Sequence, residues 1–344
     1  MALNVTLTVL LAVIGCLVIL CAVFTAMFFR MGMSRYLKRG DRLKPSAFDK
    51  RGRPENYSDI PKELDPLRSE MRACAEWMRD SNFEEHDITS FDGLKLHGRF
   101  LPADGEMKGI ILMMHGFRSN PVHDFSCAVK CFHEMGYGCF LPYQRAHGDS
   151  EGKYITFGAF ERFDCRDWAV FIEEKYPGYP LILDGVSMGA TTVLAASGLD
   201  LPSNVKGIIA DCGFTSPYDI FEAVMKNAFK LPKFPLFYTV RAVTRLIAGF
   251  DLEDFSTVEE VKKNSLPILF AHGEADGFVP CEMSRRGYEA AKKCCNATLF
   301  TVPDAGHGLS FLVDREGYLR LLDRFLKDCT DTVGPLGEVS NESR

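Results

Sequence analysis

Residues 181–197 read LILDGVSMGATTVLAAS, and this stretch decides the fold. Its apolar start predicts a buried strand, and the small residues after it predict a helix packed close to a sheet. Between them lies Gly-x-Ser-x-Gly, formed by Gly185, Ser187 and Gly189, which in a strand-turn-helix unit is a nucleophile elbow. Glycine is needed at both places because a larger side chain would collide with neighbouring backbone. Ser187 would stand at the helix N-terminus, where N–H groups favour a developing negative charge.

A serine nucleophile needs a base and an acid that orients the base. His307 is the best-placed base, because it lies between two glycines just after the last expected strand, 297–302. The acid should follow the preceding strand, 267–271, where the loop offers Glu274 and Asp276. We favour Asp276, which lies further along the loop and can turn toward His307, and keep Glu274 as the alternative.

An oxyanion hole is also required. One N–H should come from Met188, directly after the nucleophile, and the other from Phe117, in the loop after the expected strand 109–114. Gly116 permits the turn of this loop, and His115 is expected to brace it by hydrogen bonding rather than to act as a base.

The first 29 residues carry no charge before Arg30, and they are long enough to span a bilayer. A cleaved signal peptide would need a basic n-region, which is absent, so we expect residues 1–30 to be a retained membrane anchor. Basic residues then follow at once: Arg30, Arg35, Lys38, Arg39, Arg42 and Lys44. The positive-inside rule puts the body in the cytoplasm, and the 12 scattered cysteines fit a reducing compartment.

The rest of the chain divides into a basic juxtamembrane linker at 31–62, a body at 63–329 and a disordered tail at 330–344. In the body, strands 83–91 and 94–101 form a hairpin at Asp92-Gly93. Alternating strands and helices follow, among them helices 125–135 and 157–176. This order predicts an α/β fold with a mostly parallel, eight-stranded sheet between helices. The net charge of −6 argues against a nucleic-acid partner.

Residues 215–264 interrupt the alternation with helical pieces rich in aromatic side chains. A long insertion here is typical of a cap over the site, and its aromatic content predicts an apolar acyl or aryl pocket. The alternative is that it only covers the edge of the sheet.

Four motifs together resemble the α/β-hydrolase superfamily, most closely its bacterial serine-aminopeptidase-like and esterase-like branch. They are His115-Gly116-Phe117, Gly185-Val186-Ser187-Met188-Gly189, the 272–276 loop and Gly306-His307-Gly308. The resemblance covers about 83–326 and implies a Ser-His-Asp hydrolase, but not a substrate, since members cleave esters, lipids, thioesters and peptides. The run 143–150 departs from the family pattern at Tyr143 and Ala146, which leaves the local pocket shape open.

The favoured function is hydrolysis of a small ester or lipid-like substrate by Ser187, His307 and Asp276, without metal or cofactor. One alternative is a peptidase, which needs acidic groups for a substrate amine; Glu222 and Glu253-Asp254 are the only hints in the cap. The other is a membrane-tethered interaction protein without turnover. The oligomeric state stays open.

Overall fold

The computed structural model describes residues 2–35 and 65–330. Most of the expected linker and nearly all of the expected tail therefore lie outside the described residues. The start of the expected linker and the first residue of the expected tail are described, and both are helical. Helix α1 continues through Met33, and Thr330 is the last residue of helix α11.

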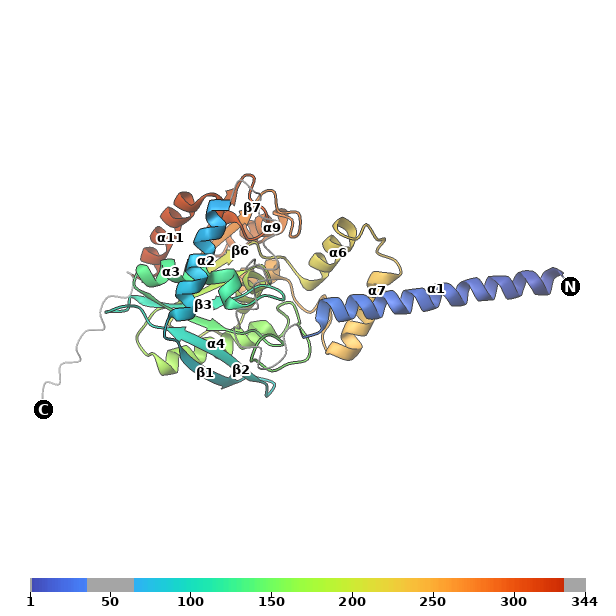
Figure 1. The fold of residues 1–344 in the computed structure, drawn as a ribbon, viewed down its shortest axis with the longest axis horizontal. Coiled ribbons are helices and arrows are strands. Elements are labelled where there is room, and N and C mark those ends of the chain that lie inside the picture. The colour runs from blue at the N-terminus through green and yellow to red at the C-terminus, as the bar shows by residue number, and fades with distance from the viewer. Residues whose placement is uncertain (1, 36–64, 331–344) are drawn as a thin grey trace, which may run out of the picture.

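One eight-stranded sheet forms the centre of the body, as the sequence predicts (Figure 1). The spatial order is β1-β2-β4-β3-β5-β6-β7-β8; β1 and β2 pair antiparallel, β2 pairs antiparallel with β4, and all other pairs are parallel. The strands are β1 (Glu84–Thr89), β2 (Lys95–Leu101), β3 (Gly109–Met114), β4 (Tyr137–Pro142), β5 (Leu181–Val186), β6 (Val205–Asp211), β7 (Ile268–Gly273) and β8 (Ala297–Val302).

Helices cover both faces of this sheet, because its central strands are apolar on both sides. On β3, Ile110 and Leu112 pack toward one layer, and Ile111 and Met113 pack toward the other. The first layer holds α4 (Glu161–Lys175), α5 (Met188–Ala196) and α9 (Glu282–Ala291). The second holds α2 (Asp65–Asp80), α3 (Pro121–Glu134) and α11 (Arg315–Thr330), with the short α10 (Ser310–Val313) before it.

Two helix starts differ from the sequence-based prediction for local reasons. Helix α3 begins earlier, at Pro121, because the Asn120 side chain accepts a hydrogen bond from the His123 N–H (3.1 Å) and proline suits a first turn. Helix α4 begins later, at Glu161, because Phe157 has φ 54° and cannot continue a helix.

The insertion at 215–264 is helical, as expected. It forms α6 (Pro217–Asn227), α7 (Leu236–Val243), the π-helical turn η4 (Thr244–Ala248), α8 (Thr257–Glu260) and the 3-10 turn η5 (Val261–Lys263). No strand occurs within 215–264, all of which the structure describes. Its apolar side chains form a second core with the aromatic residues around Phe157.

Helix α1 (Ala2–Met33) projects from the body with its C-terminal end packed against α7 (Figure 1). The hydroxyl groups of Thr25 and Thr239 share a hydrogen bond of 2.6 Å. Met33 is fully buried, and its carbonyl accepts a hydrogen bond from the Ile155 N–H (2.7 Å). The end of α1 is therefore part of the folded body and not a free tether.

Candidate active site

Ser187 occupies a sharp turn between β5 and α5. Its backbone has φ 55° and ψ −117°, which few non-glycine residues adopt. A Cβ on Gly185 would lie 2.3 Å from the carbonyl carbon of Gly189, and a Cβ on Gly189 would lie 1.7 Å from the carbonyl oxygen of Met114. Both contacts are impossible, so the two glycines are required for the reason that the sequence suggests.

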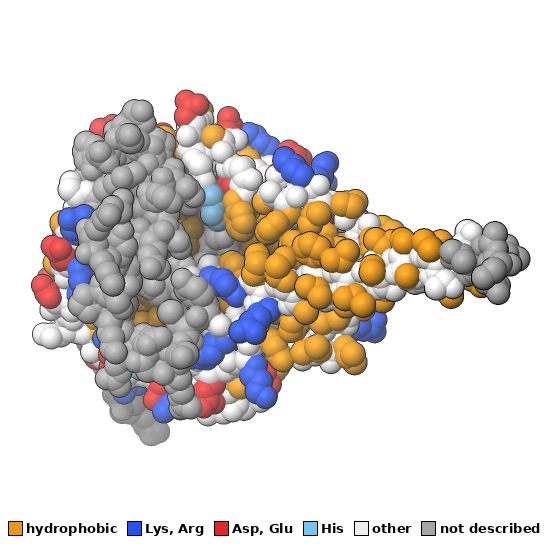
Figure 2. Space-filling model, turned by 45° about the vertical axis from the view of Figure 1, so that its right-hand side comes forward, with side chains coloured by type: hydrophobic (Ala, Val, Ile, Leu, Met, Phe, Trp, Pro, Cys, Tyr) orange, Lys and Arg blue, Asp and Glu red, His pale blue; other side chains and the backbone are white. Residues whose placement is uncertain are grey.

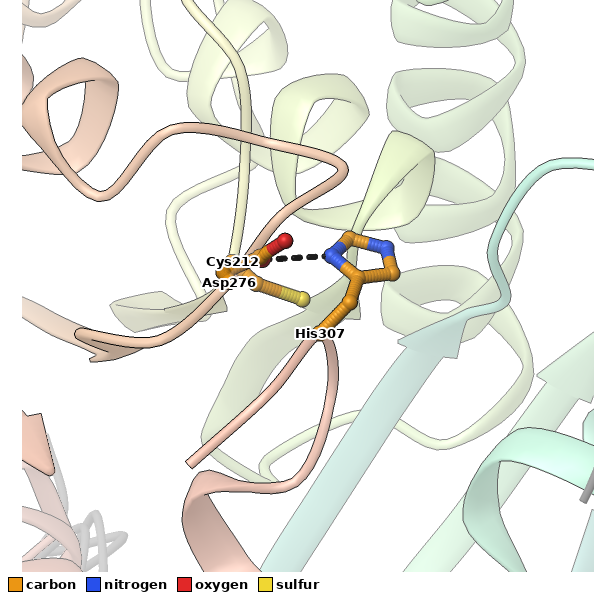
Figure 3. Close-up of side chains that lie close together, drawn as sticks. All are labelled: Cys212, Asp276 and His307. Carbon is orange, nitrogen blue, oxygen red and sulfur yellow. Dashed lines mark hydrogen bonds and ion pairs between the residues drawn. The ribbon is translucent and has the colours of Figure 1, made fainter. Parts of the chain in front are cut away.

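The structure brings the three sequence-predicted residues together. His307 Nε2 lies 2.9 Å from Ser187 Oγ, and His307 Nδ1 lies 2.6 Å from Asp276 Oδ2. Figure 3 shows the carboxylate of Asp276 facing the imidazole of His307. Ser187 comes from the end of β5, Asp276 from the loop after β7 and His307 from the loop after β8, so all three lie at the carboxyl edge of the sheet.

The Asp276 carboxylate is held from several sides. Its Oδ1 accepts hydrogen bonds from the N–H groups of Phe278 and Val279, both at 2.8 Å. Burial alone would raise the pKa of Asp276, but hydrogen bonds from His272 and His307 and the nearby imidazole charge lower it overall. Glu274, the alternative acid, pairs instead with Arg285 at 2.7 Å. The geometry therefore favours Asp276 as the partner of His307.

His272 belongs to the same network without reaching Ser187. Its Nδ1 lies 2.7 Å from Ser284 Oγ, and its Nε2 lies 3.2 Å from Asp276 Oδ2 and 3.0 Å from the carbonyl oxygen of Val279. A proton on Nε2 satisfies both oxygen acceptors, and Nδ1 then accepts from the serine hydroxyl. His272 thus supports the acid loop, as a hydrogen-bonded loop residue.

The loop that carries Phe117 is fixed on both sides of that residue. The Gly116 N–H donates to Asp124 Oδ2 (2.7 Å), and the Arg118 N–H donates to His147 Nε2 (3.1 Å). Among the described hydrogen bonds, none uses the N–H of Phe117 or of Met188. Their role as oxyanion donors stays a prediction.

Two buried histidines hold this loop as neutral rings. His115 Nδ1 lies 2.8 Å from the Gly116 carbonyl oxygen, so His115 braces the loop as expected. His147 Nδ1 lies 2.9 Å from the Arg145 carbonyl oxygen, which leaves Nε2 as the acceptor for Arg118. Burial lowers the pKa of both rings, and their mutual proximity lowers that of His147 further. The positioning roles of His147 and Asp124 are not predicted from the sequence, because each depends on a partner from another loop.

A cavity of about 680 Å³ opens beside Ser187 and His307. It runs beneath α3 toward Tyr318 and Leu322 of α11. Of the described residues that line it, none lies in 215–264, so this cavity is not the expected acyl pocket under the cap aromatics. The cap aromatics pack instead around Phe28 and Met33 of α1.

The wall of this cavity contains two buried acidic residues, Asp184 on β5 and Asp211 on β6. Burial, together with the Asp211 charge, raises the pKa of Asp184 to about 8. Burial also raises the pKa of Asp211, whose Oδ1 accepts a hydrogen bond from Ser310 Oγ at 3.2 Å. The acidic hints in the cap are engaged elsewhere, since Glu222 pairs with Lys233 (3.0 Å).

Cys212, Asp276 and His307 are the one set of described side chains close enough to hold a metal ion, with ligand atoms within 4.8 Å of one another (Figure 3). A thiol must lose its proton to bind a metal. Burial raises the pKa of Cys212 well above its ordinary value, and Asp276 already accepts from His307. A protonated thiol and an already paired carboxylate therefore fit a metal ion poorly.

Comparison with known proteins supports the same fold. Residues 105–234, which include Phe117 and Ser187 but not Asp276 or His307, match the family described as serine aminopeptidase, S33. The uncharacterized protein YqkD of Bacillus subtilis is 25% identical over 258 residues, which cover 73% of this chain and 83% of YqkD. Caffeoylshikimate esterase of Arabidopsis thaliana is 30% identical over 131 residues, 37% of this chain and 38% of the esterase.

Among solved structures, the Pyrococcus furiosus esterase Pf2001 superposes with a TM-score of 0.61 at 24% identity, covering 73% of this chain and 92% of the esterase. A hydrolase from Penicillium, GrgF, gives a TM-score of 0.53 at 20% identity, covering 73% and 99%. These likenesses establish the fold. The chain has the α/β-hydrolase fold, which is the fold that its four motifs suggest.

Proposed function

We propose that this protein is a serine hydrolase that cleaves carboxylic esters with apolar acyl groups. The observation that carries the proposal is the unbroken series of contacts from Ser187 Oγ through His307 to Asp276, at 2.9 and 2.6 Å. Nucleophile, base and orienting acid within hydrogen-bond reach are the requirements of acyl transfer by serine.

In the proposed reaction, Ser187 Oγ attacks the acyl carbonyl while His307 Nε2 accepts its proton. Asp276 holds the proton of His307 on Nδ1 and stabilises the imidazolium that forms. The N–H groups of Phe117 and Met188 donate to the tetrahedral oxyanion. His307 then protonates the leaving alcohol, and water releases the acyl group by the same route.

The cavity supports an apolar substrate. Beyond Ser187 its walls include Phe125 and Phe132 of α3 and Leu322 of α11, which suit an acyl chain. The peptidase alternative gains one argument, because Asp184 and Asp211 also line the cavity. Because the pKa of Asp184 is raised to about 8, this carboxyl is mostly protonated at neutral pH and pairs weakly with an ammonium group. We therefore keep the ester as the preferred substrate.

We also propose that α1 is a retained single span, with residues 63–329 as one cytoplasmic hydrolase domain and about 215–264 as its cap. One described helix, Thr6–Met33, has the length and hydropathy to cross a membrane, and its most apolar part is exposed. A signal sequence passes the same test, but cleavage near the end of α1 would remove Phe28 and Met33 from the core. The basic run after Arg30 favours the cytoplasmic side.

The test uses the full chain in detergent micelles, with p-nitrophenyl esters of graded acyl length and aminoacyl-nitroanilides. We expect ester turnover in the wild type, and Ser187→Ala to lower kcat/KM by at least about 10⁴-fold. A fluorophosphonate probe should label the wild type and not the variant. Equal turnover by both proteins, or a folded wild type that neither turns over esters nor reacts with the probe, would contradict the proposal.

A further inference from the structure

The cap carries a large apolar surface that the folded chain leaves exposed. Its members on α7, on η4 and in the segment before them are Phe234, Tyr238, Leu246 and Ile247, with 74%, 50%, 85% and 50% of their surface exposed. Figure 2 shows hydrophobic side chains running without a break from the body onto the projecting helix α1. We call these four residues the cap face. Exposed apolar patches of this kind are typical of a surface that binds a partner or a membrane.

The helical elements that carry the cap face lie beside one particular part of α1. The contacts between α1 and α7 begin at Cys21, whose Sγ is 3.8 Å from Thr239 Oγ1, and continue with the Thr25–Thr239 hydrogen bond. The ring of Phe28 meets that of Phe229 at 4.8 Å between centroids. Residues 21–29 of α1 are therefore flanked by the cap, whereas the earlier residues project beyond it.

The length of the projecting part suits a bilayer. From Ala2 to Leu20 a helix rises about 28 Å at 1.5 Å per residue, close to the hydrocarbon thickness of about 30 Å. The large apolar residues of this stretch are exposed, from Leu7 to Leu20. If this part fills the hydrocarbon, the membrane surface falls at residues 21–25, which is the level of α7.

Charged side chains near the cap face are consistent with a membrane surface at the level of α7. Between Pro217 and Ala248 the sequence has five basic residues and two acidic ones, and three further acidic residues, Asp251, Glu253 and Asp254, follow within the next six positions. The Arg245 side chain is 76% exposed beside Leu246, although its guanidinium also lies 3.7 Å from Asp251. Arg30 follows at the corresponding level of α1. Basic side chains flanking an apolar face suit anionic headgroups, and tyrosine is enriched at the interface.

We propose that the cap face is a second membrane contact, in which α7 and η4 enter the interfacial layer of the same bilayer that α1 spans. This inference rests on the proposed span and goes beyond it, because it assigns a lipid contact to the cap itself. The contact holds the hydrolase against the membrane in one orientation. Its occupant is the lipid bilayer, since the apolar surface is continuous with the helix that would cross it.

This orientation brings the site close to the lipid. The guanidinium of Arg118 donates to the carbonyl oxygen of Arg30 (3.2 Å) at the end of α1. Phe117 stacks on Phe157 at 5.0 Å, and Phe157 meets Phe221 of α6 at 4.9 Å. The loop of the proposed oxyanion hole thus adjoins the membrane-proximal end of α1, which suits substrates that partition into the bilayer.

Depth-dependent quenching of tryptophan tests the contact. The full chain is reconstituted in vesicles of phosphatidylcholine and phosphatidylglycerol with or without bromine on the acyl chains. Leu246→Trp reports the cap face, Leu11→Trp the span, and Val170→Trp, on α4, the body. The signal of the two native tryptophans, Trp77 and Trp168, is subtracted with wild-type protein.

We expect bromine to quench Leu246→Trp and Leu11→Trp but not Val170→Trp, with the emission of Leu246→Trp shifted to the blue. Quenching of Leu11→Trp without that of Leu246→Trp would leave the span intact and overturn the cap contact. A blue shift at Leu246→Trp that bromine does not quench would mean that another protein surface covers the cap face, and would also overturn it. Fluorophosphonate labelling of the same samples tests the hydrolase separately.

A functional measurement uses the double variant Leu246→Glu/Ile247→Glu, with Val170→Glu as the matched control. Leu246, Ile247 and Val170 are all exposed, so neither the double variant nor the control should change the fold. We expect the double variant to hydrolyse a long-chain ester dissolved in the vesicles severalfold more slowly, with an unchanged rate on a water-soluble short-chain ester. Equal rates for the double variant and the control on the long-chain ester would contradict the proposal.

Discussion

The two regions that flank Ser187 are held together in different ways. At the strand ends, directional hydrogen bonds fix polar groups: two N–H groups hold Asp276, and His147 holds the Arg118 N–H. In the cap and the end of α1, the contacts are mainly between apolar side chains, such as Phe28 and Phe237. Hydrogen bonds fix the positions of the bonded atoms to within fractions of an ångström. Apolar packing keeps side chains close together but does not fix their relative orientation as strictly.

This difference separates two kinds of consequence. Catalytic geometry tolerates little displacement, so a small change at the strand ends should reduce the rate while the fold survives. A change in the apolar region should reduce stability first. Four substitutions test this division, from the largest expected effect to the smallest.

Asp276→Asn should have the largest effect. The amide keeps the shape of the carboxylate but favours the wrong tautomer of His307, so kcat/KM for an ester should fall about 10⁴-fold with little change in thermal stability. The matched control is Glu274→Gln, at the carboxylate that pairs with Arg285, and it should keep near wild-type turnover. Comparable losses in both variants would remove the distinction between the two carboxylates.

Phe237→Ala should act on stability. Phe237 is 1% exposed and packs its ring against Tyr218 at 4.7 Å, so truncation should lower the free energy of unfolding by about 3–5 kcal/mol. Phe234→Ala, three residues away and 74% exposed, should stay within about 0.5 kcal/mol of wild type. Thermal unfolding in detergent measures both, and a similar loss in the two variants would mean that the cap is not packed as described.

Asp184→Asn should stabilise the strand-end region at high pH. The folded-state pKa of Asp184, about 8, lies above that of an unfolded aspartate, about 4. The stability that protonated Asp184 contributes is therefore fully present below about pH 4 and is lost as the pH rises through about 8. An asparagine cannot ionise, so at pH 9 the variant should be more stable than wild type by several kcal/mol, and the gain should vanish at pH 4.

The measurement for this prediction is the free energy of unfolding across pH 4–9. Asp200→Asn, at an exposed position, is the control and should show no such pH-dependent gain. A gain for Asp184→Asn that is the same at pH 4 and pH 9 would assign the effect to packing and not to ionisation.

Thr239→Val should have the smallest effect. It removes one partner of the 2.6 Å hydrogen bond to Thr25 and should lower stability by about 1 kcal/mol. The double variant Thr25→Val/Thr239→Val should recover much of that loss, because neither hydroxyl is left unpaired. Additive losses would show that the two hydroxyl groups do not stabilise α7 against α1.

The strand-end region could largely be predicted from the sequence, because its constraints are local. Gly185 and Gly189 are required by the turn itself, and Asp276 and His307 follow strands whose apolar runs are easy to recognise. Residues that position this site from another loop could not be predicted in this way. His147 follows β4 and holds a peptide after β3, and no pattern near His147 indicates that partner.

The apolar region shows the opposite limit. Its helical content and the spanning length of α1 follow from composition, but not which surfaces meet. Any aromatic residue of the cap could have faced the site. The structure packs Phe221 and Phe237 into the core shared with α1 and leaves the cavity to α3 and α11. Non-directional contacts are hard to predict from the sequence, because many apolar side chains of similar size would satisfy them.

The junction between α1 and the cap has a consequence for biosynthesis. Thr25 and Thr239 are 214 residues apart, so at about 5–20 residues per second the ribosome needs roughly 10 to 40 s to deliver the second after the first. During this interval the buried side of α1, including Phe28 and Met33, has no partner from the cap. A nascent chain of this protein therefore exposes the apolar C-terminal end of α1 for many seconds. A chaperone or the insertion machinery would have to shield this surface until translation reaches α7.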